Sequence, residues 1–420
     1  LPLLLPEQFL LLRPLCALEN SRAEGATKGI VQAATGVGKT YLAAFDSKKY
    51  QRVLFVAHRE EILKQAAVSF KNVRNSDDYG FFYGGEKTWD KSVIFASVAT
   101  LGRQEYLTAK YFAPDYFAHI EKLIDFKKIK TFEKNIIFDG LYAASIGYFD
   151  KLLDINEIKY DSLHMFHDTN FGGGMPEPKP KYLKELIEKV KSTPNSVGFA
   201  NDGDSDRFGV INENGEYVSP NEIISILLMH LKKHKNYSGT LVKTVGASLL
   251  LNKVAEKLGV EVIETAVGFK HVGEAMRKFN PIIGGEESGG LSIQGHIPEK
   301  DGILANLLVL EAMAYANKSL VELQKDLYDF VDCKFYNDRI DKRLENVEKI
   351  KPVLEKYKNK TEIGDFKVKS IDTKDGVKLY FDDDSSWVLV RPSGTEPLLR
   401  IYFESDSVEK LEKLRMVLQG

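Results

Sequence analysis

The sequence predicts an α/β protein of several domains that ends in an α+β domain. At 420 residues the chain is long enough for roughly three or four domains. From residue 136 onward, apolar strands alternate with amphipathic helices, which is the order that builds an α/β layer. After about Cys333 the pattern changes to short strands with two flanking helices, expected at 345–357 and 408–418.

The composition is that of an ordinary globular protein and does not suggest a binder of nucleic acid. Hydrophobic residues make up 43% of the chain and charged residues 28%, so a sizeable core can be buried. The net charge of -2 argues against a nucleic-acid partner, although it leaves room for a local basic groove. Cys16 and Cys333 are far apart and form no metal-ligand cluster, which is typical of a cytoplasmic protein.

The first residues are apolar but interrupted by Pro2, Pro6 and Pro14, so they read neither as a signal peptide nor as a membrane span. The sequence does not begin with Met. We therefore expect a fragment, or a gene product with an incomplete start.

A glycine-rich turn near residue 36 has the context of a phosphate-binding loop. A short apolar strand at 28–34 precedes the turn, and a helical pattern at 41–46 follows it. The candidate nucleotide-binding residues of the turn are Gly36, Gly38, Lys39 and Thr40. In such a loop the backbone N–H groups face the phosphates, the Lys neutralises them and the Thr hydroxyl can hold Mg²⁺.

Two more strands, expected at 52–57 and 92–98, extend this pattern. Residues 12–117 thereby resemble the first RecA-like domain of superfamily-two helicases. That family next requires a strand ending in Asp-Glu, and we interpret 114–117 as its approach, but no Asp-Glu-x-His follows and no second RecA-like domain is found. The resemblance thus implies that ATP can bind without efficient hydrolysis. We also expect that residues 1–115, as a half-built sheet with an open edge, do not fold stably.

The alternation from residue 136 onward predicts two successive α/β units. Strands are expected at 135–138, 162–166, 196–200, 240–244, 260–265 and 282–285. Helices are expected at 146–153, 181–192, 220–232 and 302–316. A Gly/Pro-rich loop at 170–178 interrupts the first unit.

Three carboxylates, Asp202, Asp204 and Asp206, follow an apolar strand directly. In an extended segment their i, i+2, i+4 spacing would point all three the same way, and a hard divalent cation would relieve their repulsion. An EF-hand is the first alternative, with Glu213 at its twelfth position, but Arg207 stands where that loop requires Gly. A solvated acidic loop is the second alternative. The pattern favours a magnesium loop.

Two further loops have the composition of ligand-binding turns. In the glycine-rich turn at 284–290, Glu286 and Ser288 can bracket neighbouring sugar hydroxyls, although most such turns are only turns. The second loop lies between strands expected at 387–390 and 399–403, and its candidate phosphate ligands are Arg391, Ser393, Gly394, Thr395 and Arg400. A tight structural turn is the alternative for this second loop.

The order and spacing of these three loops resemble domains two to four of the α-D-phosphohexomutases, the phosphoglucomutase and phosphomannomutase family. The resemblance divides the chain into 1–115, a truncated P-loop RecA-like sheet, then two phosphohexomutase-type α/β domains at 116–216 and 217–330, and a TATA-box-binding-like α+β domain at 331–420. It implies a phosphorylated hexose as substrate, Mg²⁺ as cofactor and a hexose 1,6-bisphosphate as activator. It says nothing of oligomeric state or of which hexose is preferred.

The resemblance also assigns residue roles. The implied Mg²⁺ ligands are Asp202, Asp204 and Asp206, and the implied supporting residues that contact phosphate or substrate are Arg207 and Lys270. The implied readers of the sugar hydroxyls are Glu286 and Ser288. The implied grip on the non-transferring phosphate comprises Arg391, Ser393, Gly394, Thr395 and Arg400.

The chain departs from the family pattern where the family carries its phosphoryl donor. The donor is a Ser in a Thr-Ala-Ser-His-Asn-Pro type loop of domain one, and the sequence contains no such loop. A smaller departure is Ala143 and Ser145 in a turn that is usually glycine-rich. Three hypotheses follow: a phosphohexomutase impaired by the missing donor, a phosphosugar-binding module without turnover, and a nucleic-acid-dependent ATPase. A gene fusion would account for the first two.

Overall fold

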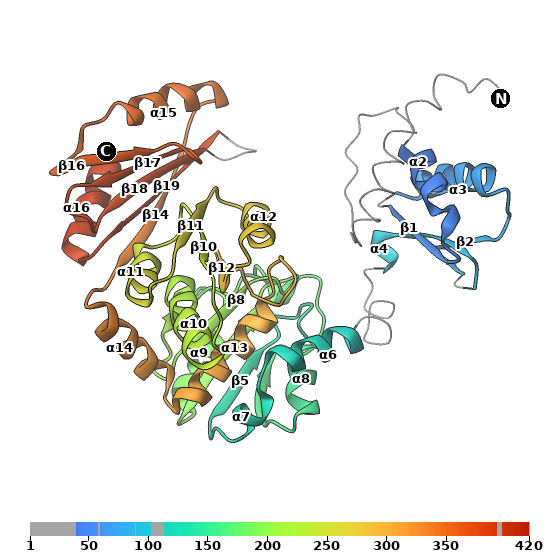
Figure 1. The fold of residues 1–420 in the computed structure, drawn as a ribbon, viewed down its shortest axis with the longest axis horizontal. Helices are drawn as coiled ribbons and strands as arrows, with labels where there is room; N and C mark the ends of the chain where they lie inside the picture. The colour runs from blue at the N-terminus through green and yellow to red at the C-terminus, as the bar shows by residue number, and fades with distance from the viewer. Residues whose placement is uncertain (1–38, 58, 89, 102–112, 393–396, 420) are drawn as a thin grey trace. The chain divides into compact units, whose positions relative to one another are not determined.

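The computed structural model describes residues 39–57, 59–88, 90–101, 113–392 and 397–419 (Figure 1). Contacts divide the chain into two compact units, Leu1–Asp115 and Tyr116–Gly420. The strand expected at 28–34 and the glycines Gly36 and Gly38 lie outside the described residues. Within the described ranges no helix is long and apolar enough to cross a membrane.

The first unit contains a four-stranded sheet in the order β1-β4-β2-β3, in which only β3 runs antiparallel. Its strands are β1 (Val53–Ala57), β2 (Tyr79–Tyr83), β3 (Glu86–Lys87) and β4 (Val93–Ser97). Its helices are α2 (Lys39–Asp46), η1 (Ser47–Lys49), α3 (Glu60–Arg74) and α4 (Val98–Leu101). The helix expected at 41–46 and the strands expected at 52–57 and 92–98 are confirmed. Aromatic rings fill the core, with the Phe70 and Phe95 centroids 5.3 Å apart.

Residues 114–117 do not approach a strand, so that interpretation was wrong. They lie in helix α6 (Ala113–Leu123), where Ile120 and Leu123 are buried in the core of the second unit. The hydroxyl of Tyr116 donates to the Asp301 carboxylate. Apolar residues recur here every three or four positions, which is the period of a helix.

The first α/β layer of the second unit is a five-stranded sheet in the order β6-β5-β7-β8-β9, with β6, β5 and β7 parallel. Its strands are β5 (Asn135–Asp139), β6 (Tyr160–Leu163), β7 (Ser196–Asn201), β8 (Phe208–Ile211) and β9 (Tyr217–Val218). Its helices are α7 (Phe126–Lys130), α8 (Phe149–Ile155), η2 (Phe171–Gly173) and α9 (Lys184–Ser192). The strand expected at 162–166 ends at Leu163, because His164 has a left-handed φ of 52°.

The second α/β layer is a four-stranded sheet in the order β11-β10-β12-β13. Its strands are β10 (Leu241–Thr244), β11 (Val262–Thr265), β12 (Ile283–Gly285) and β13 (Leu291–Ile293). Its helices are α10 (Pro220–His234), α11 (Leu249–Leu258), α12 (Phe269–Phe279), α13 (Gly302–Ala316) and α14 (Leu320–Val331). Helix α10 starts at the position expected because Ser219 and Glu222 form a reciprocal capping box.

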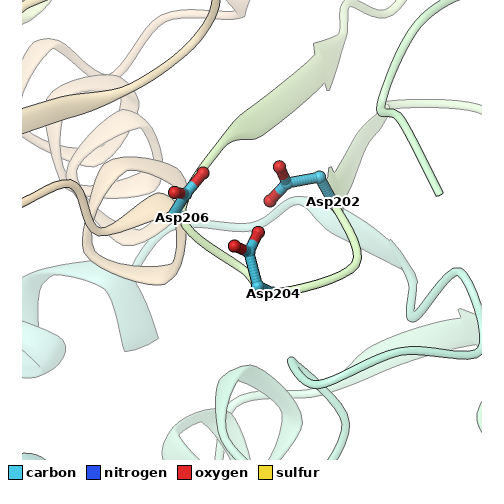
Figure 2. Close-up of side chains that lie close together, drawn as sticks. All are labelled: Asp202, Asp204 and Asp206. Atoms are coloured by element: carbon cyan, nitrogen blue, oxygen red, sulfur yellow. The ribbon is translucent and has the colours of Figure 1, made fainter. Parts of the chain in front are cut away.

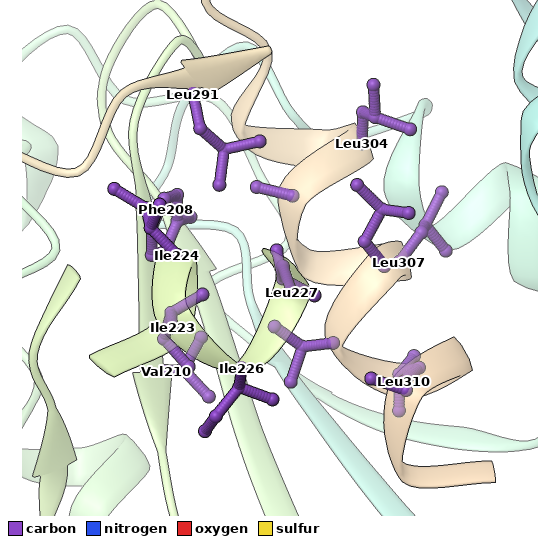
Figure 3. Close-up of a cluster of buried hydrophobic side chains, with 14 of the residues drawn as sticks. Phe208, Val210, Ile223, Ile224, Ile226, Leu227, Leu291, Leu304, Leu307 and Leu310 are labelled. Carbon is purple, nitrogen blue, oxygen red and sulfur yellow. The ribbon is translucent and has the colours of Figure 1, made fainter. Parts of the chain in front are cut away.

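Helix α13 joins the cores of the two layers. It is apolar on every side, and Leu304, Leu307 and Leu310 are fully buried. Figure 3 shows Leu304, Leu307 and Leu310 along α13, which lies beside helix α10; Phe208 and Val210 of strand β8 belong to the same buried cluster. Since β8 follows the acidic loop and α13 follows the glycine-rich turn region, this shared core fixes the two candidate loops relative to one another.

The C-terminal part is a six-stranded antiparallel sheet in the order β14-β19-β18-β17-β16-β15 (Figure 1). Its strands are β14 (Tyr336–Arg343), β15 (Glu362–Ile363), β16 (Phe366–Asp372), β17 (Val377–Phe381), β18 (Trp387–Pro392) and β19 (Leu398–Ser405). Its helices are η3 (Val347–Lys349), α15 (Ile350–Lys358) and α16 (Val408–Gln419). Side chains alternate along β18: Val388 packs in the cluster with α15 and α16, whereas Trp387 packs with Val245 of the second layer.

Candidate active site

The three predicted metal ligands lie in the turn that joins β7 to β8 (Figure 2). One carboxylate oxygen from each of Asp202, Asp204 and Asp206 lies within 4.8 Å of the others. Asp202 is only 1% exposed, whereas Asp204 is exposed and Asp206 is half-buried. The turn therefore presents three acidic ligands around one point, open to solvent on the side of Asp204.

The carboxylates converge for a different reason from the one that the sequence predicted. The segment is a tight turn and not an extended strand, and Ser205 has a left-handed φ of 64°. The Ser205 N–H donates to the Asp202 carbonyl at 3.0 Å, and the Arg207 N–H donates to Asp202 Oδ1 at 2.9 Å. These bonds bend the chain around the buried Asp202 carboxylate.

The acidic turn has the chemistry of a site for a hard divalent cation. Burial raises the pKa of Asp202 to about 6, even though the Arg207 guanidinium lies 2.5 Å from Asp202 Oδ2 and lowers that pKa. Lys300 Nζ lies 2.5 Å from Asp206 Oδ2, while Asp206 Oδ1 is buried and has no hydrogen-bond partner among the described residues. Arg207 Nε lies 3.7 Å from Asp206 Oδ1 and offers it a charge but no hydrogen bond. A buried carboxylate oxygen without a hydrogen bond, beside two other carboxylates, fits Mg²⁺, which prefers oxygen ligands.

Glu286 lies in the turn between β12 and β13 and is 5% exposed. Its Oε1 accepts the Gly268 N–H at 3.0 Å. Burial, together with the nearby Glu287 carboxylate, raises the pKa of Glu286 to about 7. Ser288 of the same turn is exposed. Glu286 is therefore held near its titration point and could donate or accept a hydrogen bond with a sugar hydroxyl.

The structure brings the acidic turn and the glycine-rich turn together. The Phe208 N–H donates to the Gly289 carbonyl at 3.0 Å, and the Gly302 N–H donates to the Ser205 carbonyl at 3.0 Å. Gly289 has a φ of 99°, which favours glycine there. The two candidate sites are thus two walls of one site.

Lys300 is a candidate site residue that the sequence did not reveal. It pairs with Asp206, and its side chain lies so close to Gly290 that an added Cβ there would meet Lys300 Cδ at 2.3 Å. Its charge lowers the pKa of Glu286. Lys300 precedes helix α13 and carries no motif of its own, so only the fold identifies it.

Lys270 is exposed in the first turn of α12. It lies two residues after Gly268, whose N–H holds Glu286. The predicted supporting Lys is therefore close in the chain to the predicted sugar reader, on a helix that begins at their shared loop.

The described part of the predicted phosphate loop contains Arg391 and Arg400, whereas Ser393, Gly394 and Thr395 lie outside the described residues. Arg391 on β18 pairs directly with Arg400 on β19. Like charges opposite one another in a sheet are destabilising, and the Asp375 carboxylate, 2.8 Å from Arg391 Nε, offsets one of the two. Arg400 Nε, by contrast, is buried without a hydrogen-bond partner in the described part of the chain. A buried, unsatisfied donor beside a second guanidinium fits an anion site.

Of the predicted nucleotide-binding residues in the first unit, Lys39 and Thr40 begin helix α2, which therefore starts ahead of the helical pattern expected at 41–46. Thr40 is half-buried, and the Lys39 side chain lies outside the described residues.

Family models match most of the chain. The models for phosphoglucomutase/phosphomannomutase alpha/beta/alpha domain II, alpha/beta/alpha domain III and the C-terminal domain match residues 114–215, 219–330 and 338–418. The model for the res subunit of type III restriction enzymes matches residues 11–141. The matches occur in the order that the sequence predicted, with a helicase-like segment first and phosphohexomutase domains two to four after it.

Known proteins give the same result. A phosphoglucomutase/phosphomannomutase of Thermococcus kodakarensis is 32% identical over 70% of this chain and 62% of its own length, so the chain spans less than two thirds of that relative. A phosphoglucosamine mutase of Methanococcus maripaludis is 30% identical over 82% of this chain and 71% of its own length. A crystal structure described as a putative phosphomannomutase from Thermus thermophilus superposes with a TM-score of 0.64 at 27% identity, covering 85% of this chain and 72% of that one. The chain belongs to the phosphoglucomutase/phosphomannomutase family, the α-D-phosphohexomutases.

Proposed function

We propose that this chain binds a hexose phosphate in a phosphohexomutase-type site and belongs to the machinery that interconverts hexose 1-phosphate and hexose 6-phosphate. The observation that carries the proposal is the joining of the acidic turn and the glycine-rich turn into one site through Lys300 and the Phe208–Gly289 backbone bond. A metal-binding wall and a hydroxyl-reading wall side by side are what a phosphosugar requires.

Each wall has a distinct task in this proposal. The carboxylates of Asp202, Asp204 and Asp206 would hold Mg²⁺, which when bound neutralises charge on a transferring phosphoryl group. Arg207 supports this wall by fixing the buried Asp202 carboxylate, and its remaining N–H groups can contact phosphate.

In this proposal the residues of the glycine-rich turn, helix α12 and the phosphate loop orient the substrate. Glu286 and Ser288 would read the sugar hydroxyls, and Lys270 would approach the substrate from the start of α12. Arg391 and Arg400, with Ser393, Gly394 and Thr395, would grip the phosphate that is not transferred. Such positioning supplies much of the catalysis in a phosphoryl transfer.

We propose that turnover needs a phosphoserine donor that these 420 residues do not supply. The sequence contains no Thr-Ala-Ser-His-Asn-Pro type loop, and in the family that Ser passes its phosphoryl group to the sugar. The 420 residues alone are then a phosphosugar-binding module.

The test is calorimetric titration of the purified chain with glucose 1-phosphate, mannose 1-phosphate and glucosamine 1-phosphate, with and without Mg²⁺. Arg391→Ala should weaken binding of the preferred sugar phosphate at least about 10-fold, because it removes a charge-assisted hydrogen bond. Arg277→Ala, an exposed Arg in the last turn of α12, is the matched control and should bind normally. Equal binding by wild type and Arg391→Ala, or none by wild type, would contradict the proposal.

For the first unit we propose only ATP binding by the glycine-rich segment of the sequence at 36–40, without efficient hydrolysis. The support is the match of residues 11–141 to the restriction-enzyme model and the start of α2 at Lys39. Protection of the chain from thermal unfolding by ATP, lost in Lys39→Ala, is the expected result, and an unchanged melting temperature would contradict it.

A further inference from the structure

Asp375 connects two parts of the proposed site that come from different sheets. It lies in the hairpin between β16 and β17, and a single oxygen, Oδ2, accepts two hydrogen bonds. One comes from Arg391 Nε at 2.8 Å and the other from the backbone N–H of Val267 at 2.9 Å. Asp375 is thus in contact with the phosphate-gripping Arg and with the loop before α12 at the same time.

The hairpin that carries Asp375 is held firmly. Gly376 has a φ of 84°, and an added Cβ there would meet the Val390 carbonyl oxygen at 2.3 Å, so the backbone packs directly against β18. Lys374 Nζ donates to the Glu264 carbonyl at 3.0 Å, which ties the hairpin to β11. The Asp375 carboxylate therefore has little freedom to move away from its two donors.

On the sugar side, the backbone segment that Asp375 holds also holds Glu286. Val267 donates to Asp375, and the next residue, Gly268, donates to Glu286 Oε1 at 3.0 Å. Gly268 has a φ of 119°, a conformation that other residues rarely adopt. A displacement of Val267 would move Gly268 and hence the hydrogen bond that orients the Glu286 carboxylate.

On the phosphate side, Arg391 donates to Asp375 through Nε, and no other side-chain hydrogen bond of Arg391 is found within the described residues. Its Nη–H groups can therefore bind a phosphate in a bidentate manner. The carboxylate also fixes the plane of the guanidinium next to Arg400, its neighbour on β19.

We propose that Asp375 is a positioning residue that couples recognition of the substrate phosphate to recognition of the sugar hydroxyls. It holds Arg391 in the plane that receives phosphate, and it holds the 267–268 backbone in the position that orients Glu286. This inference rests on the proposed function, since both ends of the contact belong to the proposed hexose phosphate site.

Removal of Asp375 should leave the two sheets together, because separate buried bonds join them. Lys378 Nζ donates to the Val245 carbonyl at 2.6 Å. Glu404 Oε1 accepts both the Leu249 N–H and Trp387 Nε1–H, each at 2.8 Å. An Asp375 variant is therefore expected to fold, which circular dichroism and thermal melting can verify.

The test uses calorimetry on the full chain with Mg²⁺ and two probes, glucose 1-phosphate and inorganic phosphate. Asp375→Ala should weaken inorganic phosphate binding about 10-fold, as expected for a lost charge-assisted bond, and weaken glucose 1-phosphate by a further several-fold. Asp375→Asn, which keeps an acceptor for one donor, should recover part of the loss. Asp372→Asn is the matched control in the same hairpin; Asp372 accepts the Lys374 N–H, and its variant should bind both probes normally.

A double-mutant comparison separates coupling from a local effect on Arg391. For glucose 1-phosphate, the effects of Asp375→Ala and Glu286→Gln should be less than additive, because Asp375→Ala already misorients the Glu286 carboxylate. Additive effects, or wild-type binding by Asp375→Ala while Arg391→Ala loses both probes, would overturn the inference and leave the proposed function standing. Failure of wild type and all variants to bind either probe would overturn both.

Discussion

Replacement of Glu286 by Gln should stabilise the folded chain while impairing recognition of the sugar. The Glu286 carboxyl is 5% exposed and lies near Glu287, and these surroundings raise its pKa from 4.5 to about 7. Gln has nearly the same shape and keeps an oxygen that can accept the Gly268 N–H. The substitution therefore removes the cost of a buried charge without removing the hydrogen bond that positions the side chain.

The sign and size of the effect follow from proton linkage. Since the folded chain holds the Glu286 proton more tightly than the unfolded chain, the free energy of unfolding falls as pH rises from about 4.5 to 7 and stays low above that. The rise in pKa corresponds to about 3 kcal/mol. Glu286→Gln should thus be more stable than wild type by about 3 kcal/mol at pH 8, and by less than about 1 kcal/mol at pH 5.

The assay is urea unfolding at pH 5 and pH 8, without Mg²⁺ and without sugar, followed by circular dichroism. Glu274→Gln, an exposed carboxylate on α12, is the matched control and should show no gain that depends on pH. Glucose 1-phosphate binding at pH 8 should weaken in Glu286→Gln even as the fold becomes more stable. Equal stability of Glu286→Gln and wild type at pH 8, or a gain of the same size at both pH values, would refute the reasoning.

Three further substitutions test other parts of the structure. Asp204→Asn should weaken Mg²⁺ binding about 10-fold in calorimetry, because it removes one of three anionic ligands, and unchanged affinity would argue against the acidic turn as the metal site. Leu307→Ala should lower the free energy of unfolding by about 2–5 kcal/mol, against less than about 1 kcal/mol for the exposed Ile155→Ala; similar losses would contradict the core in Figure 3. Ser219→Ala should cost about 1 kcal/mol of stability through loss of the α10 capping box, and a neutral result would contradict the cap.

The sequence was sufficient to locate the acidic turn, the glycine-rich turn and the candidate phosphate loop, because each follows a recognisable apolar strand. It was not sufficient for the local geometry. Residues 202–206 were expected to be extended but form a turn. Ser205 has the left-handed conformation that makes this turn, and because it is not a glycine the sequence carried no sign of it. The segment at 114–117 was too short to reveal its helical period without the apolar residues that follow at 120 and 123.

Contacts between segments that are distant in the chain could not be predicted from the sequence either. Lys300 meets Asp206 because α13 packs on β8, and Asp375 meets Val267 because one face of the C-terminal sheet packs on the second α/β layer. Neither residue lies in a motif, and a lone Lys or Asp in a polar loop is usually a solvated side chain. Only the three-dimensional packing shows that both lie beside the candidate ligands.

The measurement that tests the central claim most directly is a coupled assay for conversion of glucose 1-phosphate or mannose 1-phosphate to the 6-phosphate. It would use the purified 420-residue chain with Mg²⁺ and a hexose 1,6-bisphosphate. We predict no turnover, with glucose 1-phosphate or mannose 1-phosphate still bound by wild type and lost in Arg391→Ala. Robust turnover that Asp204→Ala abolishes would contradict the account, since it would show that these residues contain a phosphoryl donor of their own.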